Sequence, residues 1–228
     1  MSVNTSFLEL YDKTAQIGVT DFRLSVDSFD VTEHDAGVSM SQLRVMQTGA
    51  EFSSFNFQLV KGMKDITETR SSYLLDSDCD GIAFVNNNGQ EGLVFAELKS
   101  RFSTKHLKKA FQQMVFSLLK IHSMLSLCKD YSINSLSIHF IAACQCFENN
   151  DQEDSVYNYL SKAEKEVCKN FEGLFMRKLI EQKNVVITLG DLTNLWNLPL
   201  NSSLTGKTIT LSLQFTQKYG DNSTIYQY

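Results

Sequence analysis

The chain has 228 residues, with 21 Lys or Arg against 26 Asp or Glu and a formal net charge of −5. Its 43% apolar and 21% charged residues, 11 Gly and 1 Pro are typical of a globular domain with a substantial core. They exclude disordered, collagen-like and low-complexity chains, and the acidic balance excludes a protein that coats nucleic acid through bulk positive charge.

The hydrophobic pattern predicts strands that alternate with helices. A short amphipathic helix over residues 6–16 precedes a strand-like, alternating stretch over 21–61. This order predicts an α/β (α+β) layered fold in one domain, without internal repeats or a linker. The later elements are strands at 81–85 and 93–99, a helix over 104–129, a strand over 135–147, a surface loop over 148–154, a helix over 155–182, a strand over 185–189, a loop around Pro199 and a strand over 208–216.

Export and membrane signals are not visible in the sequence. The first residues lack the basic cap and apolar run of a signal peptide, and the apolar stretch over 114–128 is interrupted by Lys120 and His122. The 5 cysteines are an odd number, which does not suit a disulfide framework. We therefore expect a cytoplasmic protein with reduced thiols and no membrane association.

Two carboxylates are placed opposite each other by a predicted hairpin. Asn88-Gly89 suits a two-residue type I′ turn, whose central residues both need positive φ. Counting back from this turn pairs Asp80 with Glu97 on one face, with Cβ atoms about 4.5–5.5 Å apart. Lys99, two residues after Glu97, points to the same face.

Facing carboxylates in an apolar hairpin repel each other unless something lies between them. A divalent cation with oxygen ligands is the natural occupant, and Mg²⁺ commonly binds one or two carboxylates together with water and phosphate oxygens. A lysine beside that ion can stabilise charge on a phosphate or position the attacking water. The pattern therefore predicts phosphodiester hydrolysis.

Asp80, the Glu97-Leu98-Lys99 triplet and a following helix with Gln112-Gln113 resemble the PD-(D/E)XK nuclease superfamily. The resemblance covers residues 73–147, and Cys79 stands where many members have proline. It implies a restriction endonuclease-like αβββαβ core, with a mixed central sheet flanked by helices. Placed on this chain, the core covers about 73–190 of a single nuclease domain, 1–228, with strand-rich additions at both ends.

The same resemblance implies a magnesium-dependent DNA endonuclease, with Mn²⁺ as a substitute, that leaves 5′-phosphate and 3′-hydroxyl ends. Asp80, Glu97 and the backbone carbonyl of Leu98 would hold the metal, and Lys99 would be the active-site lysine. Several members also place a glutamine on the helix after the lysine strand. We favour Gln113 for this role, because apolar Met114 follows it as in the family pattern; Gln112 stays open, as does a solvated role for both.

A basic segment follows the predicted metal site. Residues 97–129 contain seven Lys or Arg and one acid, Glu97, within an acidic chain. Such a patch suits contact with a phosphate backbone. The alternative is that its helical lysines are simply a solvated face. The predicted nucleic-acid contacts are Arg101, Lys105, Lys108 and Lys109.

Other site types have weaker support. The Asp76–Gly81 stretch begins like a calcium loop, but Asn87 stands where the loop needs a bidentate Glu. The thiols of Cys144 and Cys146 would share a strand face, which is unlike the turn spacing of zinc ligands. Glycine-rich phosphate loops are absent from the sequence, so a nucleotide cofactor is not expected.

Several functional alternatives remain open from the sequence. By analogy with free-standing nucleases of this family, we expect a prokaryotic defence or restriction role, alone or as the nuclease component of a larger system. The partners considered beside DNA are a second copy of the chain, a helicase or ATPase, and a sensor chain. The alternatives in function are a non-catalytic interaction subunit that retains the nuclease fold, and a nuclease acting on RNA or recombination intermediates.

Overall fold

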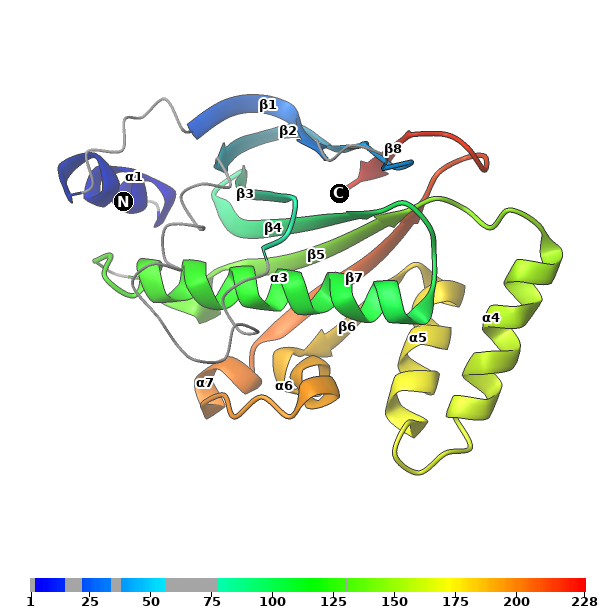
Figure 1. Cartoon of the computed structure of the whole chain (residues 1–228). Helices are drawn as coiled ribbons and strands as arrows, with labels where there is room; N and C mark the ends of the chain where they lie inside the picture. The colour runs from blue at the N-terminus through cyan, green and yellow to red at the C-terminus, as the bar shows by residue number, and fades with distance from the viewer. Residues whose placement is uncertain (1–2, 15–21, 34–37, 56–77, 130) are drawn as a thin grey trace.

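A mixed eight-stranded β-sheet and six α-helices form an α/β architecture in the part of the chain that the computed structural model describes (Figure 1). The described residues are 3–14, 22–33, 38–55, 78–129 and 131–228. The α-helices are α1 (Val3–Thr14), α3 (Thr104–Leu125), α4 (Asn150–Ala163), α5 (Asn170–Gln182), α6 (Leu189–Thr193) and α7 (Ser202–Thr205), and short 3-10 helices span Ile133–Ser135 and Asn194–Trp196. The strands are β1 (Phe22–Thr32), β2 (Gln42–Phe55), β3 (Gly81–Asn87), β4 (Gln90–Lys99), β5 (Ser137–Cys144), β6 (Asn184–Thr188), β7 (Thr208–Phe215) and β8 (Ser223–Gln227).

The sheet has the strand order β1-β2-β3-β4-β5-β7-β6, with β8 paired to β2 outside this path. Strands β1 to β4 pair antiparallel, and β5 lies parallel to both β4 and β7. The first half of β2 pairs with β8 in parallel, and its second half pairs with β3. The antiparallel strands β1 to β4 are thus joined, through β4, to the parallel strands β5 and β7.

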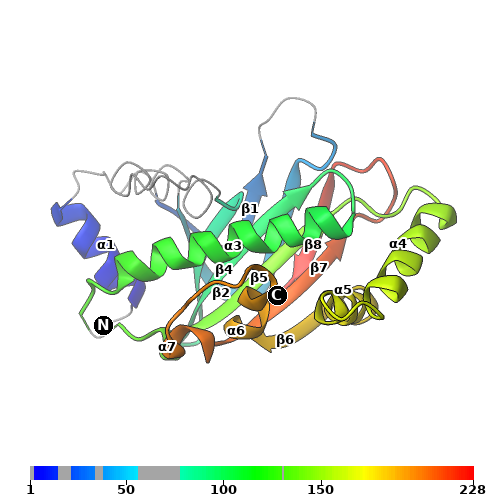
Figure 2. The ribbon, with the colours of Figure 1, turned by 60° about the horizontal axis from the view of Figure 1, so that its bottom comes forward.

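The two faces of the sheet belong to two cores. On β4, Leu93 and Phe95 pack into the larger core under α3, while Val94 and Ala96 point to a smaller core that includes β1 and β2 residues. Helix α3 crosses one face of the sheet, with α4 and α5 near its first turns and α1 near its last turns (Figures 1 and 2). Strands β1, β2 and β8 of the same sheet lie over the face of β3, β4 and β5 that is opposite to α3 (Figure 1). The end of β4 therefore lies between the two layers.

Most predicted elements are found close to their expected positions. The helix over 6–16 corresponds to α1, and the alternating stretch over 21–61 contains β1 and β2; residues 15–21 and 56–61 lie outside the described residues. The strands predicted at 81–85, 93–99, 135–147, 185–189 and 208–216 correspond to β3, β4, β5, β6 and β7, and the helix over 104–129 corresponds to α3. Among the described helices, none has the length and apolar character needed to cross a bilayer.

Two predictions between 148 and 182 are wrong. The expected loop over 148–154 is mostly helix, because α4 begins at Asn150 after an N-cap at Asn149, whose side chain accepts the Gln152 N–H. Acidic residues in this first turn favour the helix through its dipole. The expected single helix over 155–182 is two helices, α4 and α5, which meet where Gly173 comes close to Glu164. A side chain at Gly173 would clash with the Glu164 backbone, so this glycine permits the hairpin.

Candidate active site

The predicted hairpin register is confirmed in the structure. Asn88 and Gly89 have φ values of 52° and 85°, as a type I′ turn requires, and Asn87 pairs with Gln90. The β3–β4 ladder continues without a shift to Gly81 opposite Ala96. Asp80 and Glu97 follow directly after this last pair, which places the two acidic residues opposite each other.

Backbone amides hold the two carboxylates at the end of the hairpin. The Asp80 N–H donates to Oε2 of Glu97 at 3.2 Å, and the Leu98 N–H donates to Oδ2 of Asp80 at 2.7 Å. Each carboxylate thus accepts a hydrogen bond from a backbone N–H of the neighbouring chain segment, across the end of the hairpin. The carbonyl of one residue in a strand points to the same side as its N–H, so the Leu98 carbonyl also faces the Asp80 side of β4.

Lys99 and Gln113 complete the cluster from β4 and α3. Lys99 forms an ion pair with Glu97, and its Nζ also donates to Oε1 of Gln113 at 3.1 Å. The Gln113 amide is held at its other end, because Nε2 donates to the Asp78 carbonyl at 3.0 Å. Of the two glutamines considered from the sequence, the structure brings Gln113 to Lys99.

The same stripe of α3 anchors the residues before Asp80. The hydroxyl of Ser117 accepts the Cys79 N–H at 3.0 Å, and the ammonium of Lys120 pairs with the Asp78 carboxylate. Lys120 is only 1% exposed, so this member of the seven basic residues between 97 and 129 is not available to a phosphate backbone. Its role in the structure is therefore to hold the loop that leads to Asp80.

Burial and like charge raise the pKa of both carboxyl groups and so make them weaker acids. Burial raises the pKa of Glu97 well above its usual range, and Asp80 adds to this shift while Lys99 opposes it. The pKa of Asp80 rises to about 7, mainly through burial, and the Leu98 amide opposes the shift. Glu33 contributes to the raised pKa of Asp80 by its charge and by a hydrogen bond between the two carboxyl groups.

Glu33 is a third acidic residue that sequence reasoning missed. It follows β1 directly, and its N–H donates to the Ser41 carbonyl at 3.0 Å, which continues the β1–β2 pairing. It reaches Asp80 because β1 and β2 lie over the face of the sheet opposite to α3. The sequence contains no spacing that would connect a residue of the β1 end with the β3–β4 hairpin.

The donor chemistry of this cluster suits a hard divalent cation. Asp80 and Glu97 offer carboxylate oxygens and Leu98 offers a carbonyl oxygen, which are ligands that Mg²⁺ and Mn²⁺ accept. Within the described residues, no group of three or more His, Cys, Asp or Glu side chains is arranged to hold a metal. A site with two carboxylates, a carbonyl and water would match the usual mode of magnesium binding.

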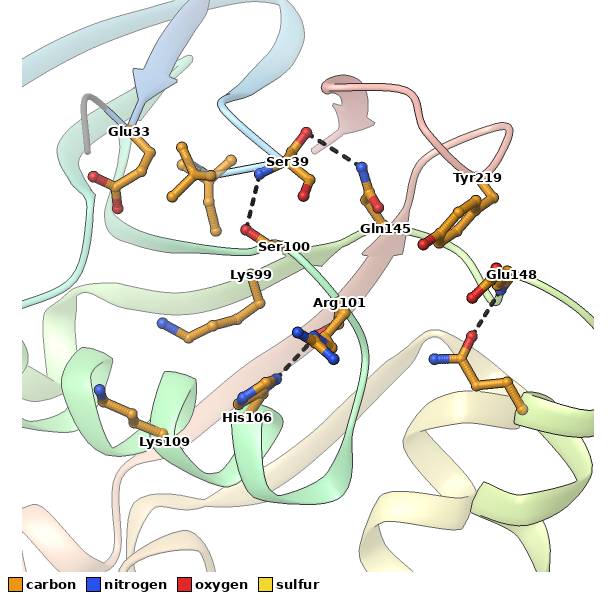
Figure 3. Close-up of a pocket in the computed structure, with 13 residues that line it drawn as sticks. Glu33, Ser39, Lys99, Ser100, Arg101, His106, Lys109, Gln145, Glu148 and Tyr219 are labelled. Carbon is orange, nitrogen blue, oxygen red and sulfur yellow. Dashed lines mark hydrogen bonds between the residues drawn. The ribbon is translucent and has the colours of Figure 1, made fainter. Parts of the chain in front are cut away.

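A polar cleft of about 600 Å³ opens beside the cluster (Figure 3). Lys99 lines this cleft and pairs with Glu97, which is 1% exposed, so the Glu97 carboxylate lies one side chain away from the cleft. Glu33, Arg101, His106 and Lys109 line the cleft as well. The cluster and the cleft therefore share Glu33, Leu98 and Lys99.

The four predicted nucleic-acid contacts have different surroundings. Arg101 and Lys109 are exposed and line the cleft. Lys105 is exposed on the first turn of α3, whereas Lys108 Nζ donates to Glu172 of α5 at 3.0 Å. The charge of Lys108 is thus already paired within the protein.

The thiols of Cys144 and Cys146 are free, as is every other cysteine of the chain.

No protein-family model matches the chain, and comparisons with curated proteins and with solved structures find no match either.

Proposed function

We propose that this chain is a magnesium-dependent endonuclease of the PD-(D/E)XK type that hydrolyses phosphodiester bonds of DNA. The observation that carries the proposal is the convergence of Asp80, Glu97 and Lys99 at one end of the β3–β4 hairpin, with Gln113 bonded to Lys99. These residue types in this arrangement are what a metal-assisted phosphodiester hydrolysis needs.

The order of elements around the cluster supports the same family. Strands β2, β3 and β4 run antiparallel, α3 follows, and β5 then lies parallel to β4. With α1 before them, these elements follow the αβββαβ order that the resemblance implies, and β1 is an additional strand between α1 and β2. In this assignment β6, β7 and β8 extend the core on its C-terminal side.

Asp80, Glu97 and the Leu98 carbonyl would hold the cation. A bound Mg²⁺ lowers the pKa of its water and neutralises negative charge on a phosphate. The buried environment that raises both carboxyl pKa values becomes favourable once a cation lies beside them, because the low dielectric then strengthens attraction. The raised pKa values are therefore consistent with a site arranged for a positive ligand.

Lys99 would position the attacking water and stabilise the charge that develops on the phosphate. Its ammonium lines the cleft and is held from two sides, by Glu97 and by the Gln113 amide oxygen. Gln113 in turn keeps its orientation through the Asp78 carbonyl. The ammonium of Lys99 is thus fixed beside the carboxylates before substrate arrives, which reduces the reorganisation needed in the reaction.

Arg101 and Lys109 would contact the phosphate backbone of the substrate. Both are exposed on the same cleft as Lys99, together with His106. Their positive charges lie next to the proposed reaction centre, where binding of a phosphate backbone is needed. By analogy within the superfamily, we assign the chain to prokaryotic defence or restriction.

A cleavage assay with isosteric variants tests this proposal. Supercoiled plasmid, linear duplex, single-stranded DNA and RNA are incubated with the protein in Mg²⁺, Mn²⁺ or EDTA. We expect metal-dependent cutting that falls at least about 100-fold in Asp80→Asn and in Lys99→Met. Lys178→Met, which changes an exposed lysine of α5, is the matched control and keeps wild-type activity.

The alternatives are outcomes of the same experiment. Cutting of RNA alone would replace the DNA substrate by RNA. If wild type cuts none of the substrates, calorimetric titration with Mn²⁺ decides between the remaining possibilities. Binding that Asp80→Asn abolishes would support a nuclease site that needs a partner chain. The absence of both cleavage and Mn²⁺ binding would overturn the proposal in favour of a non-catalytic interaction subunit.

A further inference from the structure

An exposed aromatic side chain forms part of the cleft wall away from the basic residues. Tyr219 lines the cleft and is 53% exposed, an unusual exposure for a large aromatic residue. In Figure 3 its ring stands on the far side of the cleft from Lys99 and Lys109. The ring is therefore available to a ligand that occupies the cleft.

The turn that carries Tyr219 is closed by its own hydrogen bonds. The Lys218 N–H donates to the Asp221 carboxylate at 3.0 Å, and the Asp221 N–H donates to the Lys218 carbonyl at 3.2 Å. Gly220 has φ of 91°, a conformation that suits glycine. These contacts hold the backbone on both sides of Tyr219, so the ring is presented by an ordered turn.

A buried glutamine joins this turn to the opposite loop and to the active-site strand. Gln145, 4% exposed, donates from Nε2 to the carbonyls of Asp221 at 3.1 Å and Ser39 at 3.2 Å. Its backbone N–H donates to the Lys99 carbonyl at 3.4 Å. The position of Tyr219 relative to Lys99 is thus set by one residue, whose side chain bonds to two of the segments and whose backbone bonds to the third.

Apart from Glu33, which lies beside the carboxylate cluster, the charges that line the cleft differ from one side to the other. Arg101, His106 and Lys109 come from the β4–α3 junction and from the first turns of α3, where the helix dipole also favours an anion. Beside Tyr219 the cleft instead has the exposed acid Glu148 and the neutral Gln145. Phosphates are thus favoured at Arg101, His106 and Lys109 and disfavoured at Glu148.

We propose that the cleft binds a single strand of nucleic acid, with its phosphates along Arg101, His106 and Lys109 and an unpaired base stacked on Tyr219. A single strand has one backbone and free base faces, which match one basic wall and one aromatic wall. A continuous duplex keeps its base faces inside the stack and would bring a second phosphate backbone towards Glu148. The inference rests on the proposed function and narrows its substrate to DNA with an unpaired segment.

Binding measured in EDTA separates this inference from catalysis. Fluorescence anisotropy follows short labelled oligonucleotides, either single-stranded or as a blunt duplex of the same sequence. We expect wild type to prefer the single strand, and Tyr219→Ala to lose about 5- to 100-fold in affinity for it. Tyr219→Phe keeps the ring and most of the affinity. Tyr159→Ala, which removes a 41% exposed tyrosine of α4, is the matched control and binds like wild type.

A strand that carries abasic sites tests for stacking directly. Wild type and Tyr219→Ala should bind an abasic oligonucleotide with equal affinity, because no base remains to stack. Equal affinity of wild type and Tyr219→Ala for the normal single strand would overturn the inference. It would also be overturned if Tyr219→Ala lost as much affinity for the duplex as for the single strand. If cleavage and Mn²⁺ binding both fail while the Tyr219 effect persists, the proposed function is wrong and the binding site stands. If cleavage is found without a Tyr219 effect, only the inference is wrong.

Discussion

Lys120 and Asp78 form a buried ion pair between α3 and the residues that precede the active-site hairpin. The side chains are 0% and 5% exposed, respectively. The Asp78 carbonyl accepts the Gln113 amide at 3.0 Å, and Cys79 bonds to Ser117. A buried charge pair is therefore connected, through Gln113, to the ammonium of Lys99. This pair links the stability of the domain to the geometry of the candidate site.

Breaking this pair should destabilise the protein strongly. Lys120→Met leaves the Asp78 carboxylate buried without its cation, and we expect a loss of about 3–5 kcal/mol in the free energy of unfolding. The double variant Lys120→Met/Asp78→Leu removes both charges and should recover part of this loss. Urea denaturation measures each value. Lys105→Met, on an exposed position of the same helix, should change stability by less than about 0.5 kcal/mol. A loss below 1 kcal/mol in Lys120→Met would show that the pair contributes little.

Gln113 should affect the catalytic rate more than substrate binding. Its amide oxygen accepts from Lys99 and its amide nitrogen donates to the Asp78 carbonyl, so Gln113→Ala frees the ammonium of Lys99. We expect kcat to fall about 10- to 100-fold with little change in KM, because positioning of the lysine matters in the transition state. Initial rates of cleavage at varied substrate concentration provide both constants. Gln112→Ala, one position away on another side of α3, is the control, and an equal effect of both variants would contradict the assignment.

Metal affinity should rise with pH up to about neutrality. Asp80 has a pKa raised to about 7, and Glu97 also has a raised pKa, so protons compete with the cation below this range. Metal binding requires the ionised carboxylates, and each competing proton weakens it by up to about tenfold per pH unit. Calorimetry with Mn²⁺ at pH 6, 7 and 8 measures this dependence, and Asp80→Asn shows how much of the heat belongs to the site. Equal affinity at pH 6 and pH 8 would be inconsistent with the raised pKa values.

A partly buried histidine should make the fold sensitive to acid. His139 of β5 lies 2.5 Å from the Ser212 hydroxyl and 3.1 Å from the Tyr226 hydroxyl, and burial lowers its pKa from 6.5 to about 4. Between these two values the unfolded chain binds more protons than the folded one, so stability falls as the pH is lowered through this window. The full contribution is lost only below pH 4.

For this group alone, linkage predicts a loss of about 2 kcal/mol between pH 7.5 and pH 5. His139→Gln keeps a polar side chain and cannot be protonated in this range, so its stability should fall less over the same interval. Urea denaturation of both proteins at the two pH values provides the difference, in which the titration of Asp80 and Glu97 cancels. An identical fall in wild type and His139→Gln would contradict the lowered pKa.

The contacts that the sequence predicts are those between near neighbours in the chain. The Asn88-Gly89 turn determines the β3–β4 register, since its two positive φ values need only neighbouring residues. The opposition of Asp80 and Glu97 therefore follows from the sequence. The hairpin between α4 and α5 does not, because the break depends on Gly173 approaching Glu164 from the next helix. Hydrophobic periodicity continues across that break and predicts one helix.

What the sequence by itself determined is the succession of strands and helices and the arrangement of Asp80, Glu97 and Lys99, because hydrophobic period and turn chemistry act between near neighbours. Only the tertiary structure brought Glu33 to Asp80, buried Lys120 against Asp78, and joined Ser39 and Asp221 through Gln145. These last contacts connect residues 106 and 76 positions apart. Such contacts depend on how the sheet layers and α3 pack, and packing is decided by the whole core rather than by any local pattern.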